Sequence, residues 1–385
     1  MNENIVNTID PQLEENQIEA TDESMVPIKV PFDPNLIRIR RDPFTLGELI
    51  DKIEHNEVNF FTLFQRKADL WDITKKSRLI ESVLLKLPLP AFYFDEIVEE
   101  DEGSSEKTYH WQVIDGLQRC SVLRDYAVKK EMNLENLEFL TQFNDKKFTA
   151  LPRELQRRIT QTPITVYVVE KGTPDEVKFN IFKRINTGGL ILTPQEIRHA
   201  LNQGIPAQFV ADLAELDEFR KATCYIIKSD RMEDRDFATR FVSFYLKDYT
   251  EYEPDLDSFM TKCMASLKNT SDDFRVKMKE DFKRAMNTAI TVFNNDAFRK
   301  RKYPEDRRRP LNKALFETLS VAFSKLNEDK TEVLINKAEL FKEKFMELNR
   351  DNRFFSSLAS GTGQKENVTV RFREIFKIVN ETITF

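Results

Sequence analysis

The stretch that most constrains the fold is residues 109–123, where an apolar run changes into a helical pattern across one glycine. The run has β character up to Asp115, and helical spacing begins at Leu117. Gly116 has no Cβ, so the backbone at this corner can come close to a ligand. The first N–H groups of the following helix are unpaired and lie at the positive end of its dipole, which favours phosphate. Arg119 adds a bidentate positive donor, and Asp115 could hold a metal ion or orient a water.

An isolated Asp-Gly-x-x-Arg pattern is short, and by itself it favours a plain strand–turn–helix corner. In that alternative Arg119 lies in solvent or in an ion pair. A second stretch, residues 182–198, shifts the balance towards a site. There a charged helix end runs into Asn186-Thr-Gly-Gly189 and then directly into another helix start.

At these residues the chain resembles the ParB-like domain at the N-terminus of GmrSD-type modification-dependent restriction proteins, which is also found in related phage-defence proteins. The resemblance covers roughly residues 64–201, in four blocks that keep the family order. The family usually shows Asp-Gly-Gln-Gln-Arg, and here Leu117 stands where the first Gln is expected. The four blocks are Phe64-Gln65-Arg66 with Trp71, residues 79–90, Val113–Arg119 and Phe182–Leu201.

The resemblance implies an α+β domain of ParB/sulfiredoxin type that binds a nucleoside triphosphate (GTP or another) with Mg²⁺. Gly116 and the N–H groups behind it would hold the phosphates, and Arg119 and Arg66 would neutralise them. Asp115 would coordinate Mg²⁺ or align water, with Gln118 as its helper. Electrostatic positioning of this kind can support phosphoryl hydrolysis without a covalent step. Further residues placed in the cofactor site are Gln65, Arg184, Asn186, Thr187, Gly188, Gly189 and Arg198.

Local patterns add expectations about single residues. Thr193 begins a helix, and Glu196 is more readily its capping-box partner than a site residue. Arg198, one turn further on, is the better functional candidate. We also expect Arg119 to lie outside the core, because a charged residue in a first helical turn is rarely buried.

Length and charge predict the domain organisation. A chain of 385 residues favours two domains. Residues 1–28 are expected to be a disordered acidic tail, because residues 1–26 hold seven acids and no Lys or Arg. Residues 29–200 would form the ParB-like domain. Residues 201–385 would form an all-helical domain, because their apolar residues recur every three to four positions throughout. Without the tail the formal charge of −6 becomes nearly neutral, so acidity does not argue against an anionic partner.

A basic cluster in the helical half is a candidate contact for DNA. Residues 299–309 hold seven basic residues in eleven around Tyr303. Phosphate contacts from such a loop would give affinity without sequence choice. A solvated loop between helices is an equally good interpretation. The basic residues are Arg299, Lys300, Arg301, Lys302, Arg307, Arg308 and Arg309.

The chemistry that the sequence lacks limits its function. Three separate histidines give no His-based nuclease motif, so any DNA cleavage would belong to a separate nuclease subunit. Scattered cysteines, with no signal peptide or membrane-spanning run, predict a cytoplasmic protein. The leading hypothesis is a nucleotide-hydrolysing sensor subunit of a prokaryotic restriction or anti-phage system. The alternatives are a DNA-binding or scaffold protein without turnover, which Leu117 favours, and a helical domain that serves as a homodimer or partner-docking module.

Overall fold

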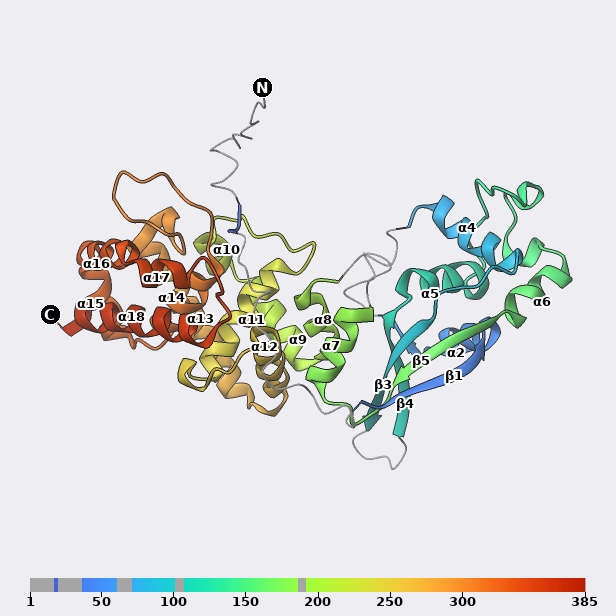
Figure 1. The fold of residues 1–385 in the computed structure, drawn as a ribbon, viewed down its shortest axis with the longest axis horizontal. Helices are drawn as coiled ribbons and strands as arrows, with labels where there is room; N and C mark the ends of the chain where they lie inside the picture. The colour runs from blue at the N-terminus through green and yellow to red at the C-terminus, as the bar shows by residue number, and fades with distance from the viewer. Residues whose placement is uncertain (1–16, 20–36, 61–70, 101–106, 186–191, 385) are drawn as a thin grey trace, which may run out of the picture. The chain divides into compact units, whose positions relative to one another are not determined.

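The computed structural model describes residues 17–19, 37–60, 71–100, 107–185 and 192–384 (Figure 1). Its contacts divide the chain into two compact units. One unit is Phe32–Ile191, and the other is Leu192–Phe385 together with Met1–Pro31. The first unit contains a sheet and the second is helical, which confirms the predicted mixed α+β fold with a helical C-terminal region.

The unit Phe32–Ile191 is built on a five-stranded sheet of order β1-β5-β3-β4-β2. β5 is parallel to β3 and β4 to β2, while β1–β5 and β3–β4 are antiparallel. The β-branched run Pro163–Val169 forms β5, next to the centre of the sheet. The strands are β1 (Ile39–Thr45), β2 (Val58–Asn59), β3 (Phe92–Glu100), β4 (Lys107–Asp115) and β5 (Pro163–Val169).

Helices cover both faces of this sheet. Four of them share one hydrophobic core with alternate strand residues such as Phe92, Phe94 and Trp111. They are α2 (Leu46–Glu54), α4 (Ile73–Leu84), α5 (Leu117–Leu123, extended by a π turn Arg124–Val128) and α6 (Arg153–Gln161). Helix α7 (Asp175–Ile185) lies against β4, and its Lys178 pairs at 2.7 Å with Asp95, which points to the opposite face from Phe92 and Phe94.

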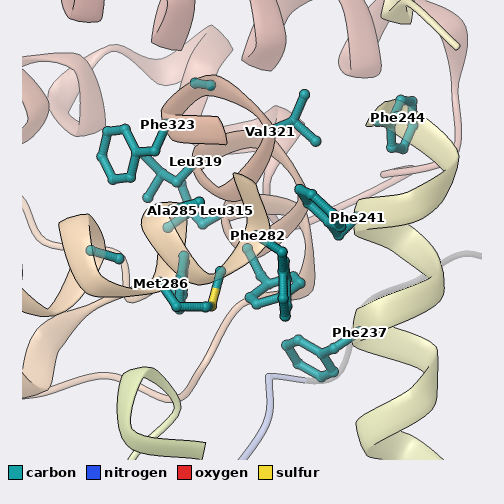
Figure 2. Packing of buried hydrophobic residues seen from close by; sticks show 14 of the residues in the cluster. Phe237, Phe241, Phe244, Phe282, Ala285, Met286, Leu315, Leu319, Val321 and Phe323 are labelled. Carbon is teal, nitrogen blue, oxygen red and sulfur yellow. The ribbon is translucent and has the colours of Figure 1, made fainter. Parts of the chain in front are cut away.

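The helical unit has a core rich in phenylalanine. Phe241 of α11 lies 4.5 Å from Phe282 of α13, measured between ring centroids, and α14 packs against both helices (Figure 2). The helices are α8 (Pro194–Leu201), α9 (Ile205–Ala214), α10 (Asp217–Ala222), α11 (Glu233–Leu246), α12 (Leu256–Ser266), α13 (Asp272–Phe293), α14 (Lys313–Ser324), α15 (Glu328–Asn336), α16 (Ala338–Arg350), α17 (Asn352–Ser357) and α18 (Lys365–Thr384). Within the described ranges, every helix is too short or too polar to span a bilayer.

Part of the N-terminal stretch that was expected to be disordered pairs with this unit. Ile18 forms a parallel bridge with Leu311, and its side chain packs against the helical core. The Glu19 carboxylate accepts hydrogen bonds from the buried Lys300 ammonium and, at 3.0 Å, from the Asn312 amide. Residues 17–19 are therefore held in place by the chain's C-terminal half.

Candidate functional site

The corner between β4 and α5 has the backbone geometry that the sequence predicted. β4 ends at Asp115, and Gly116 follows in the left-handed region with φ 105° and ψ 11°. The first intrahelical bond runs from the Cys120 N–H to the Gly116 carbonyl at 2.8 Å, so the N–H groups of residues 117–119 form the open first turn. A Cβ on Gly116 would lie 2.8 Å from a ring carbon of Phe92. The protein itself therefore requires glycine here.

Arg119 is part of the protein interior, so the expectation that it lies outside the core is wrong. Only 8% of the residue is exposed. Its guanidinium donates to the carbonyls of Pro90 and Ala91 and, at 2.9 Å, to the Asp115 carboxylate. It also lies 4.3 Å above the Phe92 ring. Arg119 thus joins the start of β3 to the corner and fixes the orientation of Asp115.

Asp115 is the carboxylate of this corner that solvent reaches. Its side chain is 31% exposed and its Oδ2 accepts the bond from Arg119. In the sheet it lies opposite Tyr93, whose ring stacks on Tyr167 with centroids 4.9 Å apart. Burial, with Tyr167 and Asp115 nearby, raises the pKa of Tyr93. Sequence analysis missed this aromatic pair, although strand alternation puts both rings on the face opposite to Phe92.

The corner offers one carboxylate for a divalent ion. The described part of the chain contains no group of three or more His, Cys, Asp or Glu side chains that could hold a metal. Mg²⁺ in nucleotide sites is usually bound by one or two carboxylates, substrate phosphates and water. Asp115 therefore fits the kind of ion that binds together with phosphate oxygens and water. Gln118 is half-buried in the first turn of α5.

The remaining predicted cofactor residues divide into three groups. Arg184 is exposed in the last turn of α7. Arg198 is only 1% exposed and lies in α8. The other six lie outside the described residues: Gln65, Arg66, Asn186, Thr187, Gly188 and Gly189.

Charged side chains of helix α8 pair with other parts of the helical unit. Thr193 and Glu196 form the predicted capping box, and Glu196 also pairs with Arg231 at 3.0 Å. Arg198 donates to Asp236 and Asp257, each at 2.8 Å. These carboxylates belong to α11 and α12, so they give Arg198 a structural role that the sequence did not predict.

Arg198 belongs to a chain of buried charges. Glu317 of α14 is fully buried and accepts from the guanidiniums of Arg371 (Nε, 3.0 Å) and Arg240 (3.1 Å). Arg240 in turn donates to Asp236, which Lys313 also contacts at 3.0 Å. Burial would raise the pKa of Asp236, but Lys313, Arg240 and Arg198 hold it far below its usual value. Opposite charges thus connect α8, α11, α12, α14 and α18.

The basic loop after α13 is mostly occupied by the protein's own groups. Lys300 binds Glu19, Arg301 and Arg308 both contact Asp296, and Arg299 donates to the Arg309 carbonyl. The ammonium of Lys302 and the guanidinium of Arg309 lie over the Phe355 ring. Arg307 is exposed.

Comparison with known proteins gives a family match for part of the chain. Residues 46–202 match the model of a family described as GmrSD restriction endonuclease, N-terminal domain. No curated protein matches the chain. The matched range contains the sheet unit from α2 onward, the whole β4–α5 corner and helix α8. Residues 46–202 therefore match the GmrSD N-terminal domain, and the resemblance seen in the sequence is confirmed.

Proposed function

We propose that the domain binds a nucleoside triphosphate with Mg²⁺ at the β4–α5 corner and hydrolyses it, as the regulatory part of a restriction or phage-defence system that acts on DNA. The observation that carries this proposal is the corner itself. The left-handed Gly116 begins a helical segment that continues to Val128, and the first-turn N–H groups have no acceptor within that segment. Such groups bind phosphate through direct hydrogen bonds and the helix dipole.

Each described side chain of the corner has a distinct role in this proposal. Asp115 would hold the Mg²⁺, and the ion would supply positive charge against the phosphates. Arg119 is a positioning residue, because its guanidinium is used by Pro90, Ala91 and Asp115. Gln118 orients water towards the terminal phosphate. The Tyr93–Tyr167 pair gives a flat surface beside the carboxylate.

A phosphate-release assay tests this proposal. Purified full-length protein is given each of the four nucleoside triphosphates with Mg²⁺, and Asp115→Asn is compared with wild type. Asp145→Asn is the matched control, because Asp145 is exposed in the same unit at φ 62°, a conformation that Asn adopts readily. We expect turnover in wild type and Asp145→Asn, and at least a tenfold loss in Asp115→Asn with an unchanged melting temperature. Equal turnover in all three proteins would remove Asp115 from the mechanism.

A second candidate function is nucleotide or DNA-phosphate binding without turnover. It is favoured by Leu117, which brings an apolar side chain to the first turn where the family usually has Gln. Saturable nucleotide binding by calorimetry, with no phosphate release from any of the four triphosphates, would select this function. Both functions use the same first-turn N–H groups. They are told apart because calorimetry measures binding and the phosphate-release assay measures turnover.

Contact with DNA can be tested at the exposed part of the basic loop. Arg307 is exposed, whereas Arg299 and Lys300 are buried. If Arg307 touches a phosphate, Arg307→Gln should weaken DNA binding and reduce the salt slope by about one. Arg373→Gln is the control, because Arg373 is exposed on α18 and pairs only locally with Glu374. An unchanged slope in Arg307→Gln would identify the loop as a solvated connection.

A further inference from the structure

A cavity of about 510 Å³ lies in the helical unit, between the loop that follows α13 and helix α16. Sites for small molecules typically have volumes of about 300–1,000 Å³. The cavity is therefore large enough for a ligand the size of a nucleotide.

One wall of the cavity is cationic. It contains Arg299, Arg301 and Arg308, and Asp296 is the carboxylate between two of them. The Asp296 oxygens lie 2.5 Å from Arg301 Nη1 and 3.3 Å from Arg308 Nε. Burial and the neighbouring Arg308 lower the pKa of Arg299. Counted over the whole lining, four cations (with Lys342) face three carboxylates (with Glu339 and Glu343), so one positive charge is left for a bound anion to balance.

The opposite wall, on α16, has an apolar part beside charged side chains. Phe345 and Met346 of α16 line it, and Phe345 packs edge-on against Phe293 at 5.1 Å between ring centroids. Lys342 and Glu339, paired at 2.7 Å, and Glu343 also line the cavity. A ligand that matches both walls would have an anionic group at one end and a flat apolar body at the other.

The loop that shapes the cationic wall has unusual backbone angles. Asn294 has φ 53° and ψ −128°, and Phe298 has φ 62°. These residues flank the segment that carries Asp296. Non-glycine residues in such conformations are strained, and strain of this kind concentrates at functional sites. Ion pairs with Arg301 and Arg308 hold Asp296 in place in this strained loop.

The arginines of this wall suit a small ligand better than a DNA duplex. Arg299 is 2% exposed, and the side chains of Arg301 and Arg308 are 31% and 23% exposed. A duplex backbone needs cations that project from the surface, whereas these line a cavity. The volume of the cavity admits a single nucleotide but not a double helix.

We propose that this cavity binds a small phosphate monoester with an aromatic body, of the class of a nucleoside monophosphate. The phosphate binds to Arg301 and Arg308 through charge-assisted hydrogen bonds, and the body packs on Phe345 and Met346. This site lies in α13–α16 of the helical unit and does not depend on hydrolysis at the Asp115 corner.

Calorimetric titration of the full-length chain tests the site, with the probes AMP, GMP, CMP, UMP and inorganic phosphate. Arg308→Gln removes one cation, and Met346→Trp fills the cavity while keeping every charge. Asp115→Asn alters the other candidate site, and Arg373→Gln is the surface control. We expect at least one monophosphate to bind wild type, Asp115→Asn and Arg373→Gln equally. Affinity should fall at least tenfold in Arg308→Gln and in Met346→Trp.

Met346→Trp decides the proposal if Arg308→Gln fails to fold, because Met346 is only half-buried and makes no ion pair. The proposal is overturned if no monophosphate binds wild type, or if Met346→Trp binds as tightly as wild type. Binding that Asp115→Asn abolishes would assign the ligand to the β4–α5 corner instead. Inorganic phosphate binding as tightly as the monophosphates would show that the apolar wall makes no contribution, and would also refute the proposal.

Discussion

Replacing Arg119 with alanine should destabilise the sheet unit, because this arginine is buried and fully engaged. The change removes two hydrogen bonds to the carbonyls of Pro90 and Ala91, each with a net value of about 1 kcal/mol. Loss of the guanidinium above Phe92 adds about 0.5–1 kcal/mol. The pair with Asp115 contributes less than about 1 kcal/mol, because that carboxylate is 31% exposed and is screened by solvent.

The expected total is about 2–4 kcal/mol. With a urea dependence of about 2 kcal/mol per molar, the unfolding midpoint of the sheet unit should fall by roughly 1–2 M. Hydrogen exchange localises the effect, because amides of β3, β4 and α5 should lose protection while those of α11–α14 keep theirs. Arg157→Ala is the matched control, since Arg157 is exposed on α6 of the same unit.

The reasoning fails if Arg119→Ala unfolds at the wild-type urea concentration with unchanged protection in β3 and α5. That outcome would mean that the guanidinium makes no net contribution to the fold and is available to a ligand. Loss of nucleotide binding together with wild-type stability would then restore Arg119 as a direct phosphate contact.

Three further changes test other parts of the structure. Glu317→Gln removes the buried counter-charge of Arg371 and should cost about 3–5 kcal/mol in the helical unit, measured by urea unfolding. Gly116→Ala should lower the melting temperature more than Gly204→Ala, because both glycines have positive φ but only at Gly116 would a Cβ meet other atoms. Burial opposes ionisation of Glu81, but three backbone N–H bonds lower its pKa below the usual value. Its contribution is therefore complete above that usual value and is lost as pH falls through the lowered pKa, so Glu81→Gln should flatten the acid side of the stability profile.

The sequence predicted those features that depend on neighbouring residues. The capping box of Thr193 and Glu196 and the glycine corner both follow from patterns a few residues long, and each is present. Local chemistry fixes these features, because a cap or a left-handed turn is made by residues close in sequence.

Features that depend on distant partners could not be predicted in this way. Arg119 is buried because of the carbonyls of Pro90 and Ala91, which lie just before β3 and about 30 residues away in sequence. Arg371 is separated from Glu317 by 54 residues, and Lys300 from Glu19 by 281. Nothing periodic in a sequence identifies such pairs. From sequence alone a charged residue is expected to be exposed, because a distant partner that would allow its burial is known only from the fold.

Burial separates the charged residues of the family blocks into those that stabilise the fold and those that are available to a ligand. A buried charge is stable only with partners, and such partners occupy the groups that a ligand would need. Glu81 holds three backbone N–H groups, and Arg198 holds two carboxylates. Among the described residues of the family blocks, Asp115 combines substantial exposure with a fixed orientation, and Arg184 is exposed. Ligand binding in residues 46–202 should therefore respond to Asp115→Asn before it responds to any change at Glu81 or Arg198.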